Sequence, residues 1–367
     1  MIIENPRVTA VGTALVDFKV VNPREPFPKS HEEVPQFLSN QHEVKKSAGG
    51  SIANAMVVLS QLMPPGNVTL LQRVGLDTNG DFYRRQTPVE LASGIQVDVT
   101  NPTGVCIITI VKGGQKIDQW PEVTFHGASD ELEIPEGTGA SGDVFVTNIN
   151  AYRMLAPKRQ IVDALQEVAD NNNNFVFRLS GVLHGTGEKF EKKELDELLD
   201  SLPKMPDIIF ANSVEIQHAS GINGVYQATQ QAFPESRLMV VTNGANGSLI
   251  RFDGNVLEIS PVPMSQNDVV DTTGAGDSYM GVMLAALFTH PSIQWTEDFI
   301  ISCAEIATYA SGLIIQTLES RLTEQQLMDI RDRIELMRLK YEIEDEFTKQ
   351  YKQFHKQDPT HTGVVYE

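Results

Sequence analysis

The sequence predicts an α/β fold with a mostly parallel central sheet between two layers of helices, and a second, smaller β-sheet. From about residue 140, short apolar segments alternate with amphipathic segments of about ten residues, as in 143–149, 158–171 and 174–180. This alternation is typical of parallel strands joined by right-handed helical crossovers. Between residues 95 and 125, strand patterns follow one another without helices, which predicts the smaller sheet.

The composition is that of an ordinary globular protein. The chain has 367 residues, of which 41% are hydrophobic and 21% charged, and its formal net charge is −19. So acidic a chain is not expected to bind nucleic acid or an anionic membrane. Cys106 and Cys303 are too few for a disulfide framework or a zinc site. Without a secretion signal or an apolar run of ~20 residues, we expect a cytoplasmic protein.

The first half of the chain alternates less regularly. A strand pattern over 7–21 is interrupted by a glycine, and a polar, proline-rich stretch follows it. A Gly-Gly turn then opens a helix pattern within 47–62, whose apolar residues recur at helical spacing. Residues 67–75 are expected to form a strand, and 78–93 a turn and a helix. These elements extend the α/β pattern towards the N-terminus.

The second half continues the alternation to a charged tail. The expected strands are 143–149, 174–180, 207–212 and 237–242. The expected helices are 158–171, 189–202, 213–220 and 224–233. Residues 321–357 are charged and helical in pattern, and we expect one stripe of this helix to pack on the domain while the rest faces water.

Polar residues follow two of the expected strands, at the edge where open α/β sheets bind ligands. Asn212 and Glu215 lie one helical turn apart, so they could hold water around Mg²⁺ or simply cap the helix that begins there. The segment "TNGANG", 242–247, could let a nucleotide approach the backbone or form an ordinary hairpin turn. Taken alone, neither segment decides between its two interpretations.

The stretch "VVDTTGAGDSYMGVMLAAL", residues 269–287, is more specific. We expect Val269 and Val270 to end a strand, and the amides of Gly274, Ala275 and Gly276 to stand at the start of a buried helix. Open N–H groups at a helix start attract anions. Phosphoryl transfer needs such preorganised donors, because charge builds up on the transferred oxygens. The stretch therefore predicts a phosphate site.

Two carboxylates flank these glycines. Asp277 could complement the helix dipole, and Asp271 could be a simple helix cap. A carboxylate in the first turn could also accept the proton of an attacking hydroxyl, which favours Asp277 as a general base. The chain has no Walker A loop, since "GTGEKF", 185–190, lacks the required spacing, and no protein-kinase motifs. The phosphate site is therefore of another type.

Six segments, in order along residues 8–316, resemble the ribokinase or PfkB superfamily. They are "VGTALVD" (11–17), "AGGSIANA" (48–55), "VGLDTNGDFY" (74–83), "NSVE" (212–215), "VTNGANG" (241–247) and "DTTGAGD" (271–277). The resemblance implies a ribokinase-like three-layer α/β/α kinase domain over 1–320 that carries a small β-sheet lid, with lid strands mainly from 13–45 and 95–125. Residues 321–367 would then be a charged helical extension.

The resemblance also implies ATP as phosphoryl donor and Mg²⁺ as its helper, and leaves open a monovalent cation such as K⁺ and a monomer or a homodimer. Asp277 would be the base, and the amides of Gly274, Ala275 and Gly276 the anion hole. The acceptor would be held by Asp17, Gly49, Gly50 and Asn54. ATP would contact Thr242, Gly244, Gly247, Asp271 and Thr272. Asn212 and Glu215 would hold Mg²⁺ through water.

Two weaker similarities indicate the class of acceptor. The segment "FRLSG", 177–181, resembles adenosine kinases, although Arg178 stands where an asparagine is expected, and 308–323 resembles bacterial inosine-guanosine kinases. Both favour phosphorylation of a primary, 5′-type hydroxyl of a purine nucleoside such as adenosine, inosine or guanosine. One alternative is a sugar kinase acting on ribose, fructose or a keto-deoxy sugar acid. The other is a ligand-binding regulator without turnover.

Overall fold

A computed structural model describes residues 6–110, 123–154, 158–180, 192–288, 294–317 and 321–357. The segment 185–190 and part of the expected lid region, 111–122, lie outside the described residues.

The larger sheet has nine strands in the order β13-β12-β11-β10-β9-β8-β1-β4-β5. Their bounds are β1 Val8–Val11, β4 Val68–Gly75, β5 Ile95–Asp98, β8 Val144–Asn148, β9 Asn174–Arg178, β10 Ile208–Asn212, β11 Leu238–Thr242, β12 Ser248–Phe252 and β13 Asn255–Ile259. The strands from β5 to β11 in this order are parallel, and only β12 and β13 pair antiparallel. The predicted α/β class and mostly parallel sheet are confirmed.

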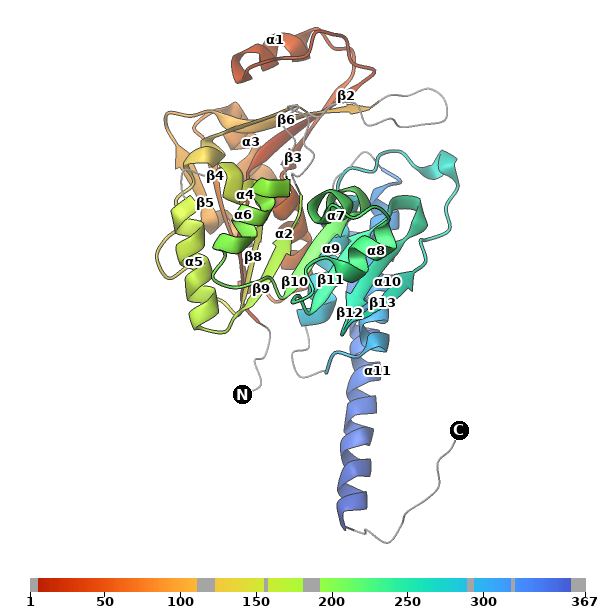
Figure 1. Ribbon diagram of the computed structural model, residues 1–367. Helices are drawn as coiled ribbons and strands as arrows, with labels where there is room; N and C mark the ends of the chain where they lie inside the picture. Colours follow the sequence, from red (N-terminus) through yellow and green to blue (C-terminus); the bar gives the residue numbers. More distant parts are fainter. Residues whose placement is uncertain are drawn as a thin grey trace.

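Helices cover both faces of this sheet (Figure 1). The helices of the described chain are α1 Val34–Ser39, which packs on the smaller sheet, α2 Ser51–Leu62, α3 Thr78–Gln86, α4 Ile149–Met154, α5 Lys158–Asp170, α6 Lys192–Ser201, α7 Ser213–Ser220, α8 Val225–Gln231, α9 Ala275–Phe288, α10 Glu297–Ile314 and α11 Glu324–Gln357. Strand residues alternate between two cores: Val144 and Val146 join the core of α2, α9, α10 and α11, whereas Phe145 joins that of α4 to α8. The three-layer architecture follows from this alternation.

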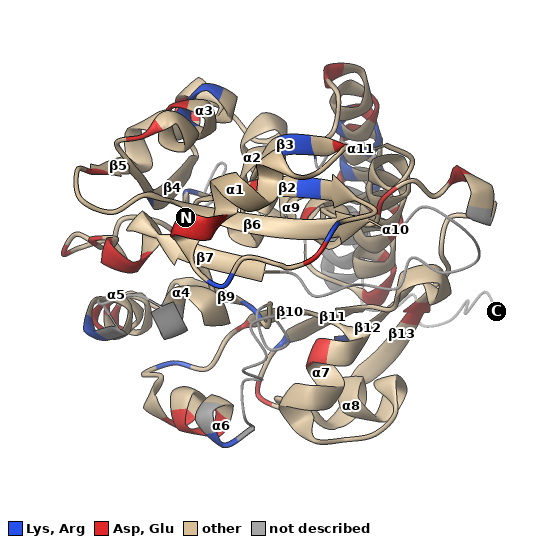
Figure 2. Cartoon of the chain, turned by 90° about the horizontal axis from the view of Figure 1, so that it is seen from above, with Lys and Arg blue, Asp and Glu red and all other residues tan. Residues whose placement is uncertain are grey.

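The lid is a four-stranded sheet in the order β3-β2-β6-β7. Its strands are β2 Leu15–Val21, β3 Val44–Gly49, β6 Thr103–Ile110 and β7 Val123–Gly127, and they lie side by side in the view from above (Figure 2). One strand of the expected lid region belongs elsewhere, because β5 pairs in parallel with β4 at the edge of the larger sheet. An alternating pattern predicts a strand but does not say which sheet edge it joins.

In the part of α11 whose side chains are described, one stripe of the helix packs on the domain, as the sequence predicts. The stripe consists of Leu327, Ile330, Ile334, Met337 and Tyr341, all buried. The ring of Tyr341 meets that of Phe299 on α10 edge to face, with 5.3 Å between centroids. Beyond this contact α11 extends away from the body of the molecule (Figure 1). No helix in the described ranges is both long enough and apolar enough to cross a membrane.

Candidate active site

The strand order reverses at β1, which has β4 on one side and β8 on the other. Ligands of open α/β sheets bind beside such a reversal, at the carboxyl ends of the strands. Asn148, the last residue of β8, lies at this edge, and its Nδ2 is 3.3 Å from Ser51 Oγ on α2 and 3.1 Å from Ser180 Oγ after β9. Sequence reasoning missed this network, although a polar residue that ends a buried apolar strand is the signal that could have revealed it.

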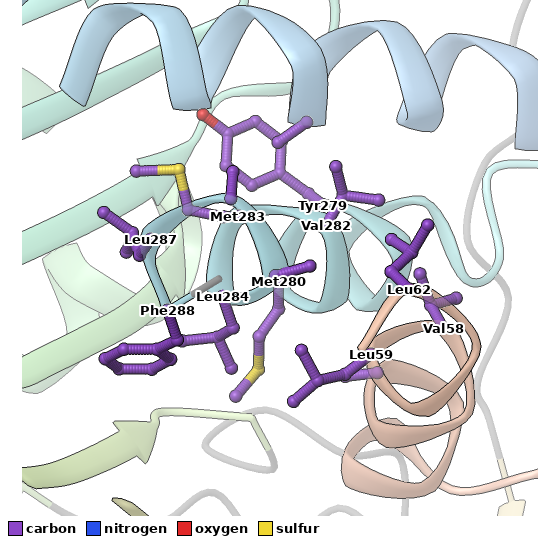
Figure 3. Close-up of a cluster of buried hydrophobic side chains, with 14 of the residues drawn as sticks. Val58, Leu59, Leu62, Tyr279, Met280, Val282, Met283, Leu284, Leu287 and Phe288 are labelled. Atoms are coloured by element: carbon purple, nitrogen blue, oxygen red, sulfur yellow. The ribbon is translucent and has the colours of Figure 1, made fainter. Parts of the chain in front are cut away.

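Helix α9 is held firmly by apolar contacts with α2 (Figure 3). All its residues from Asp277 to Phe288 are buried. The two helices approach closely at Gly281, where a Cβ would lie only 2.5 Å from Ala55 O. The buried helix therefore gives its N-terminus a fixed position.

The approach to α9 differs from our prediction. Val269 and Val270 are not part of a strand. Instead, the N–H groups of Val270 and Asp271 donate to the carbonyl oxygen of Ile315, at 2.7 and 3.2 Å. An apolar pair before a glycine turn resembles a strand end, but here Val270 N–H is bonded to the residue that ends α10 and not to a neighbouring strand. Within the turn, Ala275 N also donates to Thr272 O at 3.3 Å, so this amide is already partly used.

Asp277 lies in the first turn of α9 and is contacted from two other elements. Asn54 Nδ2, on α2, donates to Asp277 Oδ2 at 2.9 Å. Arg178 Nη1, at the end of β9, lies 2.6 Å from Asp277 Oδ1. Two neighbouring buried atoms, Asn54 Oδ1 and Ser278 Oγ, have no hydrogen-bond partner in the part of the chain that the structure describes. Buried polar atoms are normally satisfied, so these two atoms are suited to a hydrogen bond with a bound polar group or a water molecule.

The residues expected to hold the acceptor also lie together. A Cβ on Gly49 would be 2.0 Å from Asp17 Oδ2, so only glycine leaves room for this carboxylate. Gly50 precedes α2 with a φ of 101°, and Asn54 follows one turn later. Tyr83 lies nearby, with its hydroxyl 3.4 Å from Gly49 O. Burial raises the pKa of Tyr83 far above its usual range, so it is a neutral hydrogen-bonding group.

The two carboxylate oxygens of Asp271 have different contacts. Its Oδ1 accepts hydrogen bonds from Thr273 N at 2.9 Å and from Thr273 Oγ1 at 2.7 Å, which fix the loop. Asp271 is not the cap of α9, because this helix begins only at Ala275. Its Oδ2 forms an ion pair with Lys19 Nζ, on lid strand β2, at 2.7 Å. Thr272, next to it, is exposed. Sequence reasoning missed Lys19, because a lysine in an alternating strand is usually solvated.

The segment 242–247 joins β11 to β12 as a hairpin turn, the plainer of our two interpretations. Asn243 N donates to Gly247 O at 2.8 Å. Gly244 and Gly247 have φ values of 56° and 82°, and a Cβ on Gly247 would lie 2.0 Å from Ile259 O. The backbone thus requires both glycines, and contact of Thr242, Gly244 and Gly247 with ATP stays a prediction.

Asn212 and Glu215 form a capping box at the start of α7. Asn212 Oδ1 accepts from Val214 N and Glu215 N, at 2.9 and 2.8 Å, and Glu215 Oε2 accepts from Asn212 N at 2.8 Å. Their role towards Mg²⁺ stays a prediction. No group of three or more His, Cys, Asp or Glu side chains in the described ranges could hold a metal ion. Magnesium commonly keeps several waters and takes few protein ligands.

Comparison with known proteins agrees with this arrangement. Residues 6–326 match the family described as pfkB family carbohydrate kinase. Adenosine kinase 2 of Arabidopsis thaliana is 25% identical over 296 residues, which are 76% of this chain and 81% of that protein. A probable sugar kinase from Rhizobium etli CFN 42 has a TM-score of 0.72 at 19% identity, covering 90% of this chain and 100% of that one.

The fold is also that of adenosine kinase from Sinorhizobium meliloti, with a TM-score of 0.70 at 18% identity over 89% of this chain and 99% of that one. The family match covers the lid, the glycine-rich turn and Asp277 in a single span. The chain therefore belongs to the pfkB family of carbohydrate kinases, and it is an ATP-dependent phosphotransferase that acts on a sugar or a nucleoside.

Proposed function

We propose that this kinase transfers the γ-phosphoryl group of ATP to the primary, 5′-type hydroxyl of a purine nucleoside. The observation that carries the phosphotransfer chemistry is the position of Asp277, which Asn54 holds beside the N-terminus of α9. The purine nucleoside is supported by the 25% identity with an enzyme named adenosine kinase 2 and by the resemblance of 177–181 to adenosine kinases.

In this proposal the acceptor lies between Asp17 and Asp277. Carboxylate and amide side chains, here Asp17 and Asn54, suit the vicinal hydroxyls of a ribose. Asp277 accepts the proton of the attacking hydroxyl as the new O–P bond forms and the bond to ADP breaks. The amides at the start of α9, including those of Gly274 and Gly276, stabilise the charge on the transferred oxygens.

The nucleotide lies on the other side of Asp277 in this proposal. Its contacts are Thr242, Gly244, Gly247, Asp271 and Thr272. Mg²⁺ bound with ATP would neutralise phosphate charge, and the oxygens of Asn212 and Glu215 are of the kind that contacts this ion through water. Both residues lie where β10 ends, at the carboxyl edge of the sheet.

The test is ADP release with Mg·ATP and a panel of adenosine, inosine, guanosine, cytidine, ribose and fructose. Turnover on at least one purine nucleoside, well above that on the sugars, is the expected result. Turnover on sugars alone would overturn the proposal that the acceptor is a purine nucleoside. If ATP binds but none of these compounds stimulates ADP release, either the acceptor is a compound not in the panel or the protein is a ligand-binding regulator without turnover.

A sugar kinase is the second candidate. It is supported by the similarity to a sugar kinase fold and by the Asp17–Gly49 arrangement, since a diol-binding carboxylate suits free ribose as well as a nucleoside. The panel separates the two candidates, because only a nucleoside kinase requires the base.

A further inference from the structure

Arg178 departs from the expected asparagine, and its side chain reaches the start of α9. Its backbone ends β9, whereas its Nη1 lies 2.6 Å from Asp277 Oδ1. Its Nη2 lies 3.3 Å from the position that a Cβ would occupy on Gly276. Both side chains of the pair are mostly buried, with 14% of Arg178 and 11% of Asp277 exposed. A guanidinium group therefore lies beside Gly276, in the first turn of α9, whose amides are proposed to bind phosphate.

This position is unfavourable for a cation unless an anion is present. The N-terminus of a helix carries a partial positive charge, which repels a guanidinium group. Asp277 supplies the compensating charge, but Arg178 Nη1 forms no aligned hydrogen bond with it, and no other partner of this atom is found in the described residues. A guanidinium group presents donors in a rigid fork that matches phosphate oxygens. The amides and Arg178 thus direct positive charge at one place.

We propose that Arg178 is a catalytic residue that contacts the transferred phosphoryl group, and that Asp277 is its partner only while no phosphoryl group is bound. This inference rests on the proposed function. When ATP binds, Arg178 shifts from Asp277 Oδ1 to the γ-phosphoryl oxygens. Asp277 Oδ1 is then released to accept the hydroxyl proton.

The step balances without another reactant. The acceptor oxygen forms a bond to the γ-phosphorus, and its proton passes to Asp277. The bond between this phosphorus and the bridging oxygen breaks, and ADP leaves with the electron pair. Arg178 remains protonated throughout and neutralises charge on the oxygens of the transferred group. An arginine in this role typically contributes about 10³–10⁵ in kcat.

Three variants test this role. Arg178→Ala is expected to lower kcat about 10³-fold. Arg178→Lys keeps the charge and recovers part of this loss, whereas Arg178→Gln keeps a polar side chain without the charge and is expected to be nearly as slow as Arg178→Ala. Near-wild-type kcat in Arg178→Ala or Arg178→Gln would overturn the proposal. Arg159→Ala, which removes an exposed arginine from α5, is the matched control.

Nucleotide binding tests the contact without turnover. Calorimetric titration of Arg178→Ala is expected to show about 10-fold weaker binding of ATP, because a hydrogen bond to a charged phosphate is lost, and unchanged binding of ADP. If the substitution weakens the binding of ATP and ADP equally, or weakens neither, the proposed contact of Arg178 with the γ-phosphoryl group is wrong.

The two proposals can also fail separately. If no nucleoside is phosphorylated but Arg178→Ala selectively loses affinity for ATP, the proposed purine nucleoside acceptor is wrong and the role of Arg178 stands. If nucleosides are phosphorylated by Arg178→Ala at the wild-type rate, the role of Arg178 is wrong and the proposed function stands.

Discussion

Lys19 Nζ, on lid strand β2, lies 2.7 Å from Asp271 Oδ2, in the turn that leads into α9. Only 1% of the Lys19 side chain and 6% of that of Asp271 are exposed. Since Asp271 Oδ1 also holds the N–H and hydroxyl of Thr273, one carboxylate joins the lid to the glycine-rich turn. The lid is thus connected to the candidate phosphate site by a buried ion pair.

Removing one member of this pair should destabilise the protein strongly. Lys19→Met leaves Asp271 buried without its cation, and we expect the free energy of unfolding to fall by about 3–5 kcal/mol. The double variant Lys19→Met/Asp271→Asn should recover part of this loss, because no uncompensated charge remains. Urea denaturation of the wild type, both single variants and the double variant gives the coupling energy.

The exposed pair Arg159–Asp163 on α5, with 3.9 Å between Nε and Oδ2, serves as the control for this cycle. Breaking it should cost no more than ~0.5 kcal/mol. A similarly small loss in Lys19→Met would contradict a structural role for the buried pair.

Asp277→Asn should lower kcat about 10²–10⁴-fold, because the amide cannot accept the proton of the attacking hydroxyl. Asparagine keeps the size of the side chain, and binding of ATP should persist. The measurement is ADP release with the best acceptor of the panel, together with calorimetric titration of ATP. Asp268→Asn, which changes an exposed carboxylate in the preceding loop, should behave as wild type. Near-wild-type turnover of Asp277→Asn on every acceptor would refute the role of Asp277 as general base.

Gly281→Ala should destabilise the packing of α9 on α2. The added methyl group would lie 2.5 Å from Ala55 O and 2.9 Å from Val58 Cβ, so the helices must separate. Overpacking of this kind costs about 1–3 kcal/mol, which urea denaturation measures. At Gly312, on α10, an added Cβ would come no nearer than 3.3 Å to the side chain of Val262. Gly312→Ala should therefore be tolerated, and an equal loss in the two variants would argue against the helix contact.

Asp98→Asn should destabilise the protein in a pH-dependent way. Burial by itself would raise the pKa of Asp98, but hydrogen bonds from Asn101 and Thr100 and the guanidinium of Arg73 outweigh it and lower the pKa to about 2. A carboxylate whose folded-state pKa is lowered stabilises above its unfolded-state pKa, near 4, and loses this contribution as the pH falls towards 2. We expect a difference of about 2 kcal/mol at pH 7 that shrinks between pH 4 and 2 in urea denaturation.

Asp130 is the matched control, because its shift has the opposite sign. Burial, with the neighbouring carboxylate of Glu131, raises the pKa of Asp130 to about 6. The contribution of this carboxyl group to the free energy of unfolding is then fully present below pH 4 and is lost as the pH rises through 6. Asp130→Asn should therefore stabilise the protein at pH 8 and leave its stability unchanged below pH 4. The same pH trend in Asp98→Asn and Asp130→Asn would contradict both assignments.

Local pattern was sufficient for much of the fold. The strands at 8–11, 15–21 and 174–178 and the helix 51–62 follow from apolar periodicity and turn residues, which act over a few neighbouring positions. Membership of β5 in the larger sheet did not follow, since pairing depends on which edge is free after the chain has folded. The expected strand at Val269–Val270 was wrong, because the N–H groups of Val270 and Asp271 donate to Ile315 at the end of α10 and not to a strand.

The sequence by itself determined the α/β class, the glycine-rich turn and the candidate base Asp277, because these depend on residue type and spacing within short segments. Only the tertiary structure decided which distant groups meet at that base. Asn54 and Arg178 are 223 and 99 positions from Asp277 along the chain, and Lys19 is 252 from Asp271. Such contacts arise where separate elements pack together, and no local pattern encodes the distance between them.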